Sequence, residues 1–312
     1  MNDPEDASVD VAWLHYVAGL TQAQIAKQRG LSKATVHRLL RAAHESGAVR
    51  VFVGERPAST VKLERDMVSA FGLETCRLVP SVLSDVRSVT DGVAALAAQS
   101  LLAQLEANRG VVFGLGAGRT LAAMAAAFPR VSFPAAEFVS LTGDFSVFRT
   151  EHSTDVIRRL ADRTGGTGYS IAAPILANSQ ADRDVLVSQA GTRIAFQKIR
   201  QAGSTFIGIG HLHDGSFLSA FNLLNDEEIS GLRKQGVVAD LCGTLLDAGG
   251  QPVDCDVGQR MLACRLDDLR GKRNTAVAFG ETKIPAIKAV LKTGLLSELI
   301  SDAATAEGLL KN

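Results

Sequence analysis

Cysteine is scarce in this chain of 312 residues, and the few cysteines lie far apart. They are Cys76, Cys242, Cys255 and Cys264, and no two of them form a C-x-x-C pair. This spacing gives no disulfide framework and matches no common zinc motif. His211 and His213 are close to Cys242 only in sequence, so we predict no metal site and no cofactor.

Long apolar runs are also missing. The most apolar stretch, GVAALAAQSLLAQL from Gly92, contains glutamine and is too short to span a bilayer. No signal peptide precedes the basic segment near the N-terminus. We therefore expect a soluble, cytoplasmic protein without a membrane partner.

Net charge is absent as well, because 33 basic residues balance 33 acidic ones. The distribution is uneven, however. Residues 1–18 contain four acids and no lysine or arginine, whereas residues 19–50 contain six lysines and arginines against the single acid Glu45. A local basic face on a neutral chain is typical of a small DNA-binding module attached to a larger domain. The chain is long enough for both.

The segment TQAQIAKQRGLSKATVHRLL, residues 21–40, has the pattern of two short helices joined by a tight turn. Thr21 and Ser32 are predicted to cap the two helices, and Gly30 tolerates the left-handed turn between them. Inward positions are predicted for Ile25, Ala26, Val36, Leu39, Leu40 and Ala43. This pattern predicts a helix-turn-helix, although an ordinary helical hairpin with a solvated basic face would look similar.

In a helix-turn-helix the first half of the second helix enters the major groove of DNA. The candidate DNA-binding residues are Thr21, Gln22, Ser32, Lys33, Thr35, His37 and Arg38. The preceding stretch VAWLHYVAGL, residues 11–20, predicts a supporting helix with Trp13, Leu14 and Val17 on its apolar side. Arg29 stands where an apolar residue is usual, and its stem could cover the core with its charged head in solvent.

The remainder of the chain alternates between apolar strands and helices. After the strand-like AVRVFV and the break GERPAST, segments such as VVFGLGAGRTL, EFVSLTGDF, TFIGIGHL and NTAVAFGETK each predict a strand that ends in a glycine-containing loop. This alternation predicts an α/β fold with a largely parallel sheet covered on both faces. We expect a helix-turn-helix domain over residues 1–56 and a second domain over residues 57–312.

Ligands bind such sheets outside the carboxyl ends of the strands. The loop GLGAGRTL places Gly114, Gly116 and Gly118 before a helix that opens near Thr120, where free N–H groups suit a phosphate or other anion. Arg119 could add a charge and Thr120 a hydroxyl. The alternative is a tight strand-to-helix turn with no ligand, because a G-x-G-x-G run is weak evidence.

Two further segments offer polar groups to the same region. Lys283, in AFGETK, could reach an anion from another side, although Glu281 beside it could instead form a salt bridge. In VVADLCGTLLD, Asp240 follows an apolar strand and could accept hydrogen bonds from hydroxyl groups. Each of Asp240 and Asp247 could equally be a cap or a loop residue, and for Asp247 we favour that interpretation.

Catalysis finds little support in the sequence. His152, Ser153 and Asp155 are neighbours in the chain, but adjacency does not make a triad and no oxyanion hole is indicated. The glycine loop lacks the final glycine of a dinucleotide-binding fingerprint. We therefore predict a protein that is not an enzyme.

Taken together, these segments resemble the SorC/DeoR-type transcriptional regulators of bacterial carbohydrate catabolism, in the class of the sorbitol and erythritol operon regulators. The resemblance runs almost end to end, through GLTQAQIAKQRGLSKATVHRLLRAAHESGAVRV, LERDMVSAFGL, GLGAGRTL, VSLTGD, IGIG, ADLCGTLLD and GETKIPAIKAVLKTGLLSELISDAATAEGLL. The last block is the most distinctive of the effector domain.

The resemblance implies an N-terminal helix-turn-helix and a C-terminal effector domain that is similar in fold to sugar-phosphate isomerases and deaminases but acts as a sensor. Such regulators usually assemble as tetramers, which are pairs of dimers, on palindromic operators, and a phosphorylated sugar or polyol shifts their affinity for DNA. The implied effector-binding residues are Gly114, Gly116, Ala117, Gly118, Arg119, Thr120, Thr142, Asp240 and Lys283.

Two of these positions differ from the family pattern, and a third lacks the lysine that a covalent mode of effector binding would need. Asp240 occupies a Gly-Asp position that is written Ala-Asp here, and Ala117 replaces a bulky aromatic found in many relatives. Thr142 is not a lysine, which argues against covalent capture of the effector through a Schiff base at that position. The alternative functions are a sugar-phosphate isomerase or deaminase-like enzyme with a helical N-terminal extension, and a scaffold protein. The basic helix and the clustered glycine loops argue against a scaffold.

Overall fold

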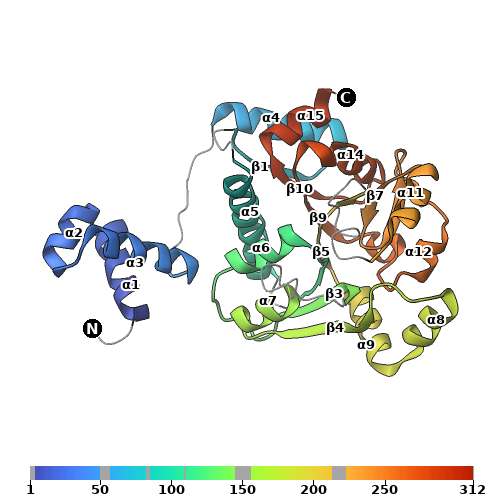
Figure 1. Ribbon diagram of the computed structural model, residues 1–312, viewed down its shortest axis with the longest axis horizontal. Helices are drawn as coiled ribbons and strands as arrows, with labels where there is room; N and C mark the ends of the chain where they lie inside the picture. Colours follow the sequence, from blue (N-terminus) through green and yellow to red (C-terminus); the bar gives the residue numbers. More distant parts are fainter. Residues whose placement is uncertain are drawn as a thin grey trace. The chain divides into compact units, whose positions relative to one another are not determined.

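The computed structural model describes residues 4–49, 57–81, 85–108, 110–144, 156–212 and 223–311. The chain divides into two compact units, residues 1–55 and residues 56–312 (Figure 1). Each unit has a hydrophobic core of its own.

The N-terminal unit is helical and forms the predicted helix-turn-helix. Its elements are α1 (Pro4–Ala12), the π-helical turn η1 (Trp13–Val17), α2 (Gln22–Arg29) and α3 (Lys33–Glu45). Thr21 caps α2 through a capping box with Gln24, and the Ser32 hydroxyl accepts the N–H of Thr35 at 3.0 Å to cap α3. Gly30 adopts φ +65° in the turn, where a side chain would be strained. The local cues in the sequence therefore predict this unit correctly.

The helix before the motif differs from the expectation. Trp13 and Val17 were expected on its apolar side, but they are 62% and 64% exposed. The buried residues are Val11 and Ala12, which face α3, and Leu14 is half-buried. Trp13 and Val17 lie four residues apart, so they share the opposite face of the helix. Nearly all residues here are apolar, and the sequence pattern alone therefore does not select the inward face.

Arg29 also differs from its expected arrangement. Its guanidinium pairs with the Asp10 carboxylate of α1 at 2.6 Å instead of extending alone into solvent. Both side chains are partly exposed, so the pair contributes little to stability, about 0–1 kcal/mol. Most of the expected strand AVRVFV falls outside the described residues.

The C-terminal unit is built on a seven-stranded sheet whose strands are all parallel, in the order β1-β10-β9-β5-β2-β3-β4. The strands are β1 (Thr75–Val79), β2 (Val112–Leu115), β3 (Glu137–Asp144), β4 (Thr167–Pro174), β5 (Ser204–Ile207), β9 (Arg273–Val277) and β10 (Glu298–Asp302). From β2 the chain proceeds outward through β3 and β4, whereas β5 returns to the other side of β2. The order of the strands thus reverses between β2 and β5.

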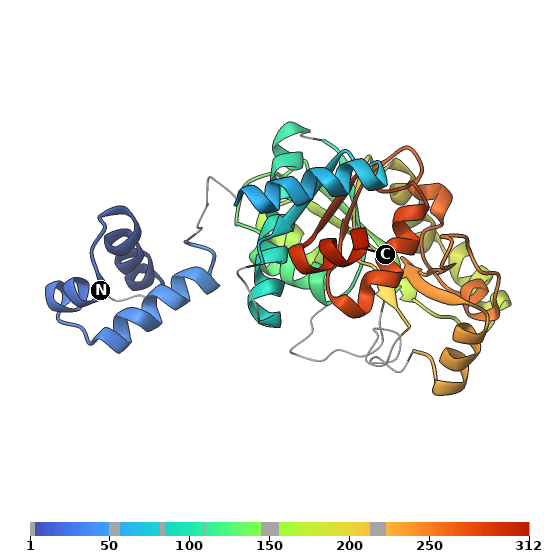
Figure 2. The same cartoon turned by 90° about the horizontal axis from the view of Figure 1, so that it is seen from above.

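Helices cover both faces of this sheet, as predicted. One face packs against α5 (Val86–Ala107), α6 (Arg119–Ala127) and α7 (Val156–Thr164) (Figure 1). The other packs against α4 (Ala58–Phe71), α9 (Ala190–Gln201), α14 (Ile284–Lys292) and α15 (Ala303–Lys311). Figure 2 shows α4 and α15 side by side on that face. Strands buried on both faces explain the near-continuous apolar runs in the sequence.

A smaller antiparallel sheet lies beside the main one, in the order β6-β7-β8. Its strands are β6 (Gly210–His211), β7 (Val237–Leu241) and β8 (Thr244–Asp247). The neighbouring helices are α8 (Gln180–Ser188), α11 (Asp226–Lys234), α12 (Asp256–Arg260) and α13 (Leu266–Leu269). Asp240 was expected to follow a strand, but it lies within β7, opposite Leu245 of the β7–β8 hairpin. The sequence shows the apolar run but does not reveal that its partner is the next strand.

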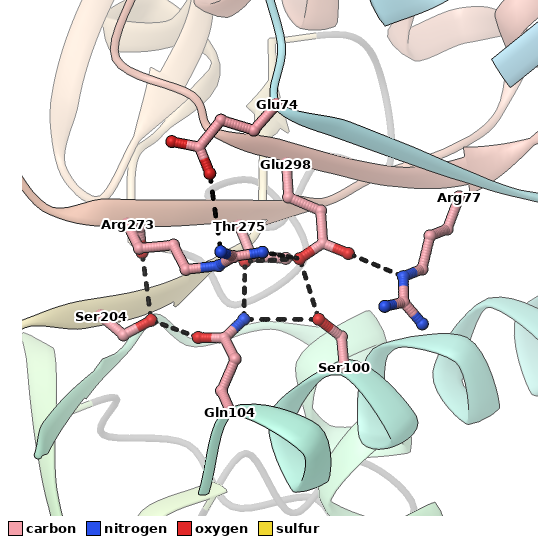
Figure 3. A network of polar contacts seen from close by, with 8 residues as sticks. All are labelled: Glu74, Arg77, Ser100, Gln104, Ser204, Arg273, Thr275 and Glu298. Carbon is pink, nitrogen blue, oxygen red and sulfur yellow. Dashed lines mark hydrogen bonds and ion pairs between the residues drawn. The ribbon is translucent and has the colours of Figure 1, made fainter. Parts of the chain in front are cut away.

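A polar network occupies the amino ends of the central strands (Figure 3). The fully buried Glu298 carboxylate accepts hydrogen bonds from Ser100 at 2.8 Å and Thr275 at 3.2 Å, and its second oxygen lies 3.0 Å from Arg77 Nε. A buried carboxylate needs such partners, because an unpaired one is costly to desolvate. The network joins α5 to β10 and β9 at the edge opposite the strands' carboxyl ends.

Candidate functional site

A cavity of about 570 Å³ opens at the carboxyl ends of the parallel strands. Its walls come from the loops that follow β2, β5, β9 and β10, from the start of α5 and from β7. The loops after β2 and β5 meet at the point where the strand order reverses. Ligands of open α/β sheets bind in the crevice at such a point.

Eight of the nine expected effector-binding residues line this cavity: Gly116, Ala117, Gly118, Arg119, Thr120, Thr142, Asp240 and Lys283. Gly114 does not line it. Gly114 lies inside β2, where an added Cβ would come within 2.7 Å of a Leu141 methyl carbon, so it permits close packing of neighbouring strands. The structure therefore brings together residues that are up to 167 positions apart in the sequence, from Gly116 to Lys283.

The glycine loop leads directly into α6. Gly118 precedes the helix with φ +124° and ψ 166°, a conformation that essentially only glycine adopts. Helix α6 begins at Arg119, and its first residues, Arg119, Thr120 and Leu121, line the cavity, so the N–H groups of its first turn lie at the cavity wall. These groups and the positive end of the helix dipole favour an anion.

Lys283 faces the same space from the short helix η3 (Glu281–Lys283). Its Nζ donates a hydrogen bond to the Ile209 carbonyl at 3.1 Å. Burial, followed by the nearby Arg119 guanidinium, lowers the pKa of Lys283 to about 8. The positive charges of Arg119 and Lys283 repel each other across the cavity, and a bound anion would reduce this repulsion. Within the described residues Lys283 makes no ion pair with Glu281.

Asp240 supplies a carboxylate to the cavity wall. One of its oxygens accepts the Gly243 N–H at 2.7 Å, so the residue also caps the β7–β8 turn. Its side chain keeps some contact with the cavity, but protein encloses the carboxylate, and this burial raises its pKa to about 6. Asp247, the last residue of β8, instead accepts the N–H groups of Gly249 and Gln251, at 2.8 and 2.9 Å, and so caps the turn that follows the strand, outside the cavity.

Several wall residues escaped the sequence analysis. Val86, Val89 and Thr90 come from the first turns of α5, whereas His211 is the last residue of β6 and Asp302 is the last residue of β10. In the sequence, the glycine-containing stretch IGIG directly precedes His211 and could have indicated that this segment borders the cavity. No local signal marks the start of α5, because only the packing of α5 on β1 and β10 brings it to the cavity.

On the N-terminal unit the candidate DNA-binding residues divide into two groups. Lys33, His37 and Arg38 lie exposed on the first turns of α3. Thr21, Ser32 and Thr35 use their hydroxyls in the caps, where Ser32 and Thr35 lie 2.8 Å apart, and Gln22 is half-buried. The first group therefore has side chains that are open to a phosphate or a base edge.

For metal ligands, membrane-spanning helices and the candidate catalytic residues, the structure speaks only for the residues that it describes. Among the described residues there is no group of three or more potential metal ligands. No described helix is both long and apolar enough to cross a membrane. His152, Ser153, Asp155 and His213 lie outside the described residues.

Comparison with known proteins identifies the family. The family model described as "Putative sugar-binding domain" matches residues 55–311, and the IclR helix-turn-helix domain model matches residues 15–51. The erythritol catabolism regulatory protein EryD of Brucella abortus (strain 2308) is 32% identical over 311 residues, which are 99% of this chain and 98% of that protein. This chain belongs to the SorC/DeoR-type family of sugar-binding transcriptional regulators.

Other relatives agree with this assignment. The transcriptional regulator LsrR of Enterobacter sp. (strain 638) is 29% identical over 98% of this chain and 93% of that protein. The crystal structure of the full-length sorbitol operon regulator SorC from Klebsiella pneumoniae has the same fold, with a TM-score of 0.78 and 23% identity over 99% of this chain and all of that one. The family assignment confirms the resemblance found in the sequence, and the chain is a DNA-binding transcriptional regulator with a sugar-binding domain.

Proposed function

We propose that this regulator controls an operon for the catabolism of a polyol or sugar, and that a phosphorylated polyol or sugar in the cavity sets its affinity for the operator. The observation that carries this proposal is the convergence of the α6 N-terminus, Arg119 and Lys283 on one cavity at the strand-order reversal. Helix N–H groups and two cations suit a phosphate, and Asp240 suits hydroxyl groups. The name of the 32%-identical relative, an erythritol catabolism regulator, supports a polyol.

The N-terminal unit is proposed to bind the operator through α3. Lys33, His37 and Arg38 supply phosphate and base contacts, while Thr21 and Ser32 orient the two helices through their caps. Two copies on a palindromic site would place their α3 helices about 34–36 Å apart or at a multiple of this distance. We propose a homodimer or homotetramer that acts in the cytoplasm, where bacterial operators are found.

The effector can alter DNA affinity only through its preference for one arrangement of the assembly over another, typically by about 1–3 kcal/mol. The protein acts as a sensor rather than an enzyme. A sugar-phosphate isomerase or deaminase would turn over its ligand, and turnover would persist after deletion of residues 1–56. For the regulator we expect the same deletion to abolish operator binding while effector binding remains.

The first test is a thermal-shift panel on the full-length protein with erythritol, xylitol, sorbitol and ribose, each compared with its phosphate. A ligand at 100 times its dissociation constant stabilises the folded state by about 2.7 kcal/mol, which is easily detected. We expect only the phosphates to raise the melting temperature. If free polyols do so equally, the glycine loop is a turn rather than an anion site.

A matched pair of lysine variants localises the site. Lys283 and Lys292 each donate Nζ to a backbone carbonyl, but only Lys283 lines the cavity. Lys283→Ala should weaken binding of the effective phosphate by at least tenfold, whereas Lys292→Ala should leave the affinity unchanged. Equal losses in both variants would place the phosphate elsewhere.

A further inference from the structure

The hydroxyl of Thr305 joins two segments of the cavity wall. Thr305 lies in the first turn of α15 and is only 2% exposed. Its Oγ1 atom donates a hydrogen bond to the Asp302 carboxylate and accepts the backbone N–H of Gly280 at 2.8 Å. Asp302 and Gly280 both line the cavity, whereas Thr305 does not. The residue therefore lies behind the wall and holds two parts of it together.

A helix cap alone does not account for these contacts. Asp302 directly precedes α15, so its bond with the Thr305 hydroxyl is local and resembles a cap. Gly280, in contrast, is 25 residues away in the chain, in the loop after β9. A hydroxyl that donates to a carboxylate becomes a better acceptor. The Asp302 carboxylate thereby strengthens the bond between Thr305 and the loop after β9.

The loop after β9 leads to Lys283, and its own backbone does not fix its conformation. Gly280 adopts φ +109° and, as a glycine, has other conformations open to it at little cost. The Lys283 N–H donates to the Gly280 carbonyl at 2.9 Å, so η3 moves with Gly280. From there Lys283 Nζ reaches the Ile209 carbonyl at 3.1 Å. The position of the ammonium group thus depends on what holds Gly280.

Helix α15 is a firm base for this contact. It packs against α4, α14 and β10, and its residue Leu309 is buried in the core. Gly308 lies so close to Ile284, the residue after Lys283, that an added Cβ would clash with the Ile284 side chain. Thr305 and Gly308 are three residues apart, so they share one side of the helix. This side of α15 faces the segment that carries Lys283.

We propose that Thr305 is a positioning residue of the effector site: its hydroxyl holds the loop after β9 against the end of β10 and so keeps the Lys283 ammonium group in the cavity. This inference rests on the proposed function of the cavity. It adds that phosphate affinity depends on a residue that does not touch the ligand. It also gives a role to the second half of the block GETKIPAIKAVLKTGLLSELISDAATAEGLL, of which the proposed function uses only Lys283.

The probe is the phosphate that raises the melting temperature most among erythritol 4-phosphate, xylitol 5-phosphate, sorbitol 6-phosphate and ribose 5-phosphate. Isothermal titration calorimetry compares its affinity for wild-type protein and for Thr305→Val, which keeps the shape of the side chain but removes the hydroxyl. We expect the affinity to fall by about three- to tenfold, because Lys283 then occupies the cavity for only part of the time. Thr305→Ser keeps the hydroxyl and should restore the affinity. Thr305→Ala, which suits a helix, is a second variant without the hydroxyl.

The Lys283→Ala background shows whether Thr305 acts through the lysine. If it does, Thr305→Val should change the affinity of Lys283→Ala by less than about twofold, since both substitutions remove the same contribution. Thr205→Val is the matched control. Thr205 is also buried, in β5, and its hydroxyl donates to Asn274 at 2.7 Å. This control should lower the melting temperature, as Thr305→Val does, but leave the affinity unchanged.

Three results would overturn the assignment while the proposed function stands. If Thr305→Val and Thr305→Ala lower the melting temperature but bind the phosphate like wild-type protein, the hydroxyl is only structural. If Thr305→Val weakens binding as much in the Lys283→Ala background, it does not act through the lysine. If Thr305→Ser fails to restore the affinity, the methyl group and not the hydroxyl is responsible. If wild-type protein binds no phosphate of the panel, or Lys283→Ala binds as tightly as wild-type protein, the proposed function fails and the inference fails with it.

Discussion

The pH dependence of effector binding follows from the position of Lys283. Burial and Arg119 lower its pKa from the usual 10.5 to about 8 in the ligand-free protein. A bound phosphate would favour the charged lysine and raise this pKa again. Binding should therefore take up a proton above pH 8, and the affinity should fall as the pH rises through the pKa of the free protein.

The size of the effect can be worked out. With a pKa of about 8, roughly 90% of Lys283 is protonated at pH 7 and roughly 10% at pH 9, which gives an affinity loss of up to about tenfold. The phosphate does not contribute, because its second pKa is about 6 and it remains a dianion over this range. The contribution of Lys283 to stability has the opposite sign: its lowered pKa makes the ligand-free protein more stable as the pH rises from 8 toward 10.5.

Isothermal titration calorimetry with the phosphate that performs best in the thermal-shift panel tests this prediction at pH 7, 8 and 9. Repeating the titration in buffers with different ionisation enthalpies counts the protons taken up. Lys283→Met should bind more weakly and show a flat profile, whereas Lys292→Ala should keep the wild-type slope. An affinity that stays constant from pH 7 to 9 in the wild-type protein would refute the reasoning.

Three further predictions concern other residues. Arg38→Ala should weaken operator binding at every salt concentration, reduce the slope of log affinity against log salt by about one, and leave effector affinity unchanged in gel-shift and calorimetric assays. Gly118→Ala should cost about 1–3 kcal/mol of unfolding free energy, measured by urea denaturation, and should weaken phosphate binding, because alanine is strained at φ +124°. The raised pKa of Asp240, about 6, means that its contribution to stability is present below pH 3.8 and is lost as the pH rises through 6. The unfolding free energy of Asp240→Asn should therefore depend less on pH between pH 4 and 7 than that of the wild-type protein. An unchanged pH profile would mean that another group takes up the proton.

Features set by neighbouring residues could be predicted from the sequence. The caps at Thr21 and Ser32 and the turn at Gly30 depend on contacts within three or four residues, and the structure has them as expected. The parallel sheet follows from apolar runs that alternate with helices. The rule that ligands bind at the carboxyl ends of strands then suffices to bring Gly118 and Lys283 to one cavity.

Features set by long-range packing could not be predicted. Gly114 belongs to the same glycine run as Gly118, yet its neighbours are Leu141 and Thr205 on adjacent strands, and no local pattern distinguishes the two glycines. Whether Trp13, the first residue of η1, faces inward depends on which face of the preceding helix α1 meets α3. No described residue bonds the buried Thr142 hydroxyl, and this depends on all the segments packed around it, so only the folded structure could reveal it.

Helix α5 has a mechanical consequence for the whole sugar-binding domain. Its 22 residues span about 33 Å, with Val86 and Thr90 in the cavity wall at one end and Ser100 and Gln104 in the Glu298 network toward the other. A helix of this length acts as a stiff rod that is anchored at its far end. A ligand that displaces the first turns of α5 must either bend the helix or shift the residues of the Glu298 network. A molecule bound at the carboxyl ends of the strands can therefore alter the structure at their amino ends without any contact there.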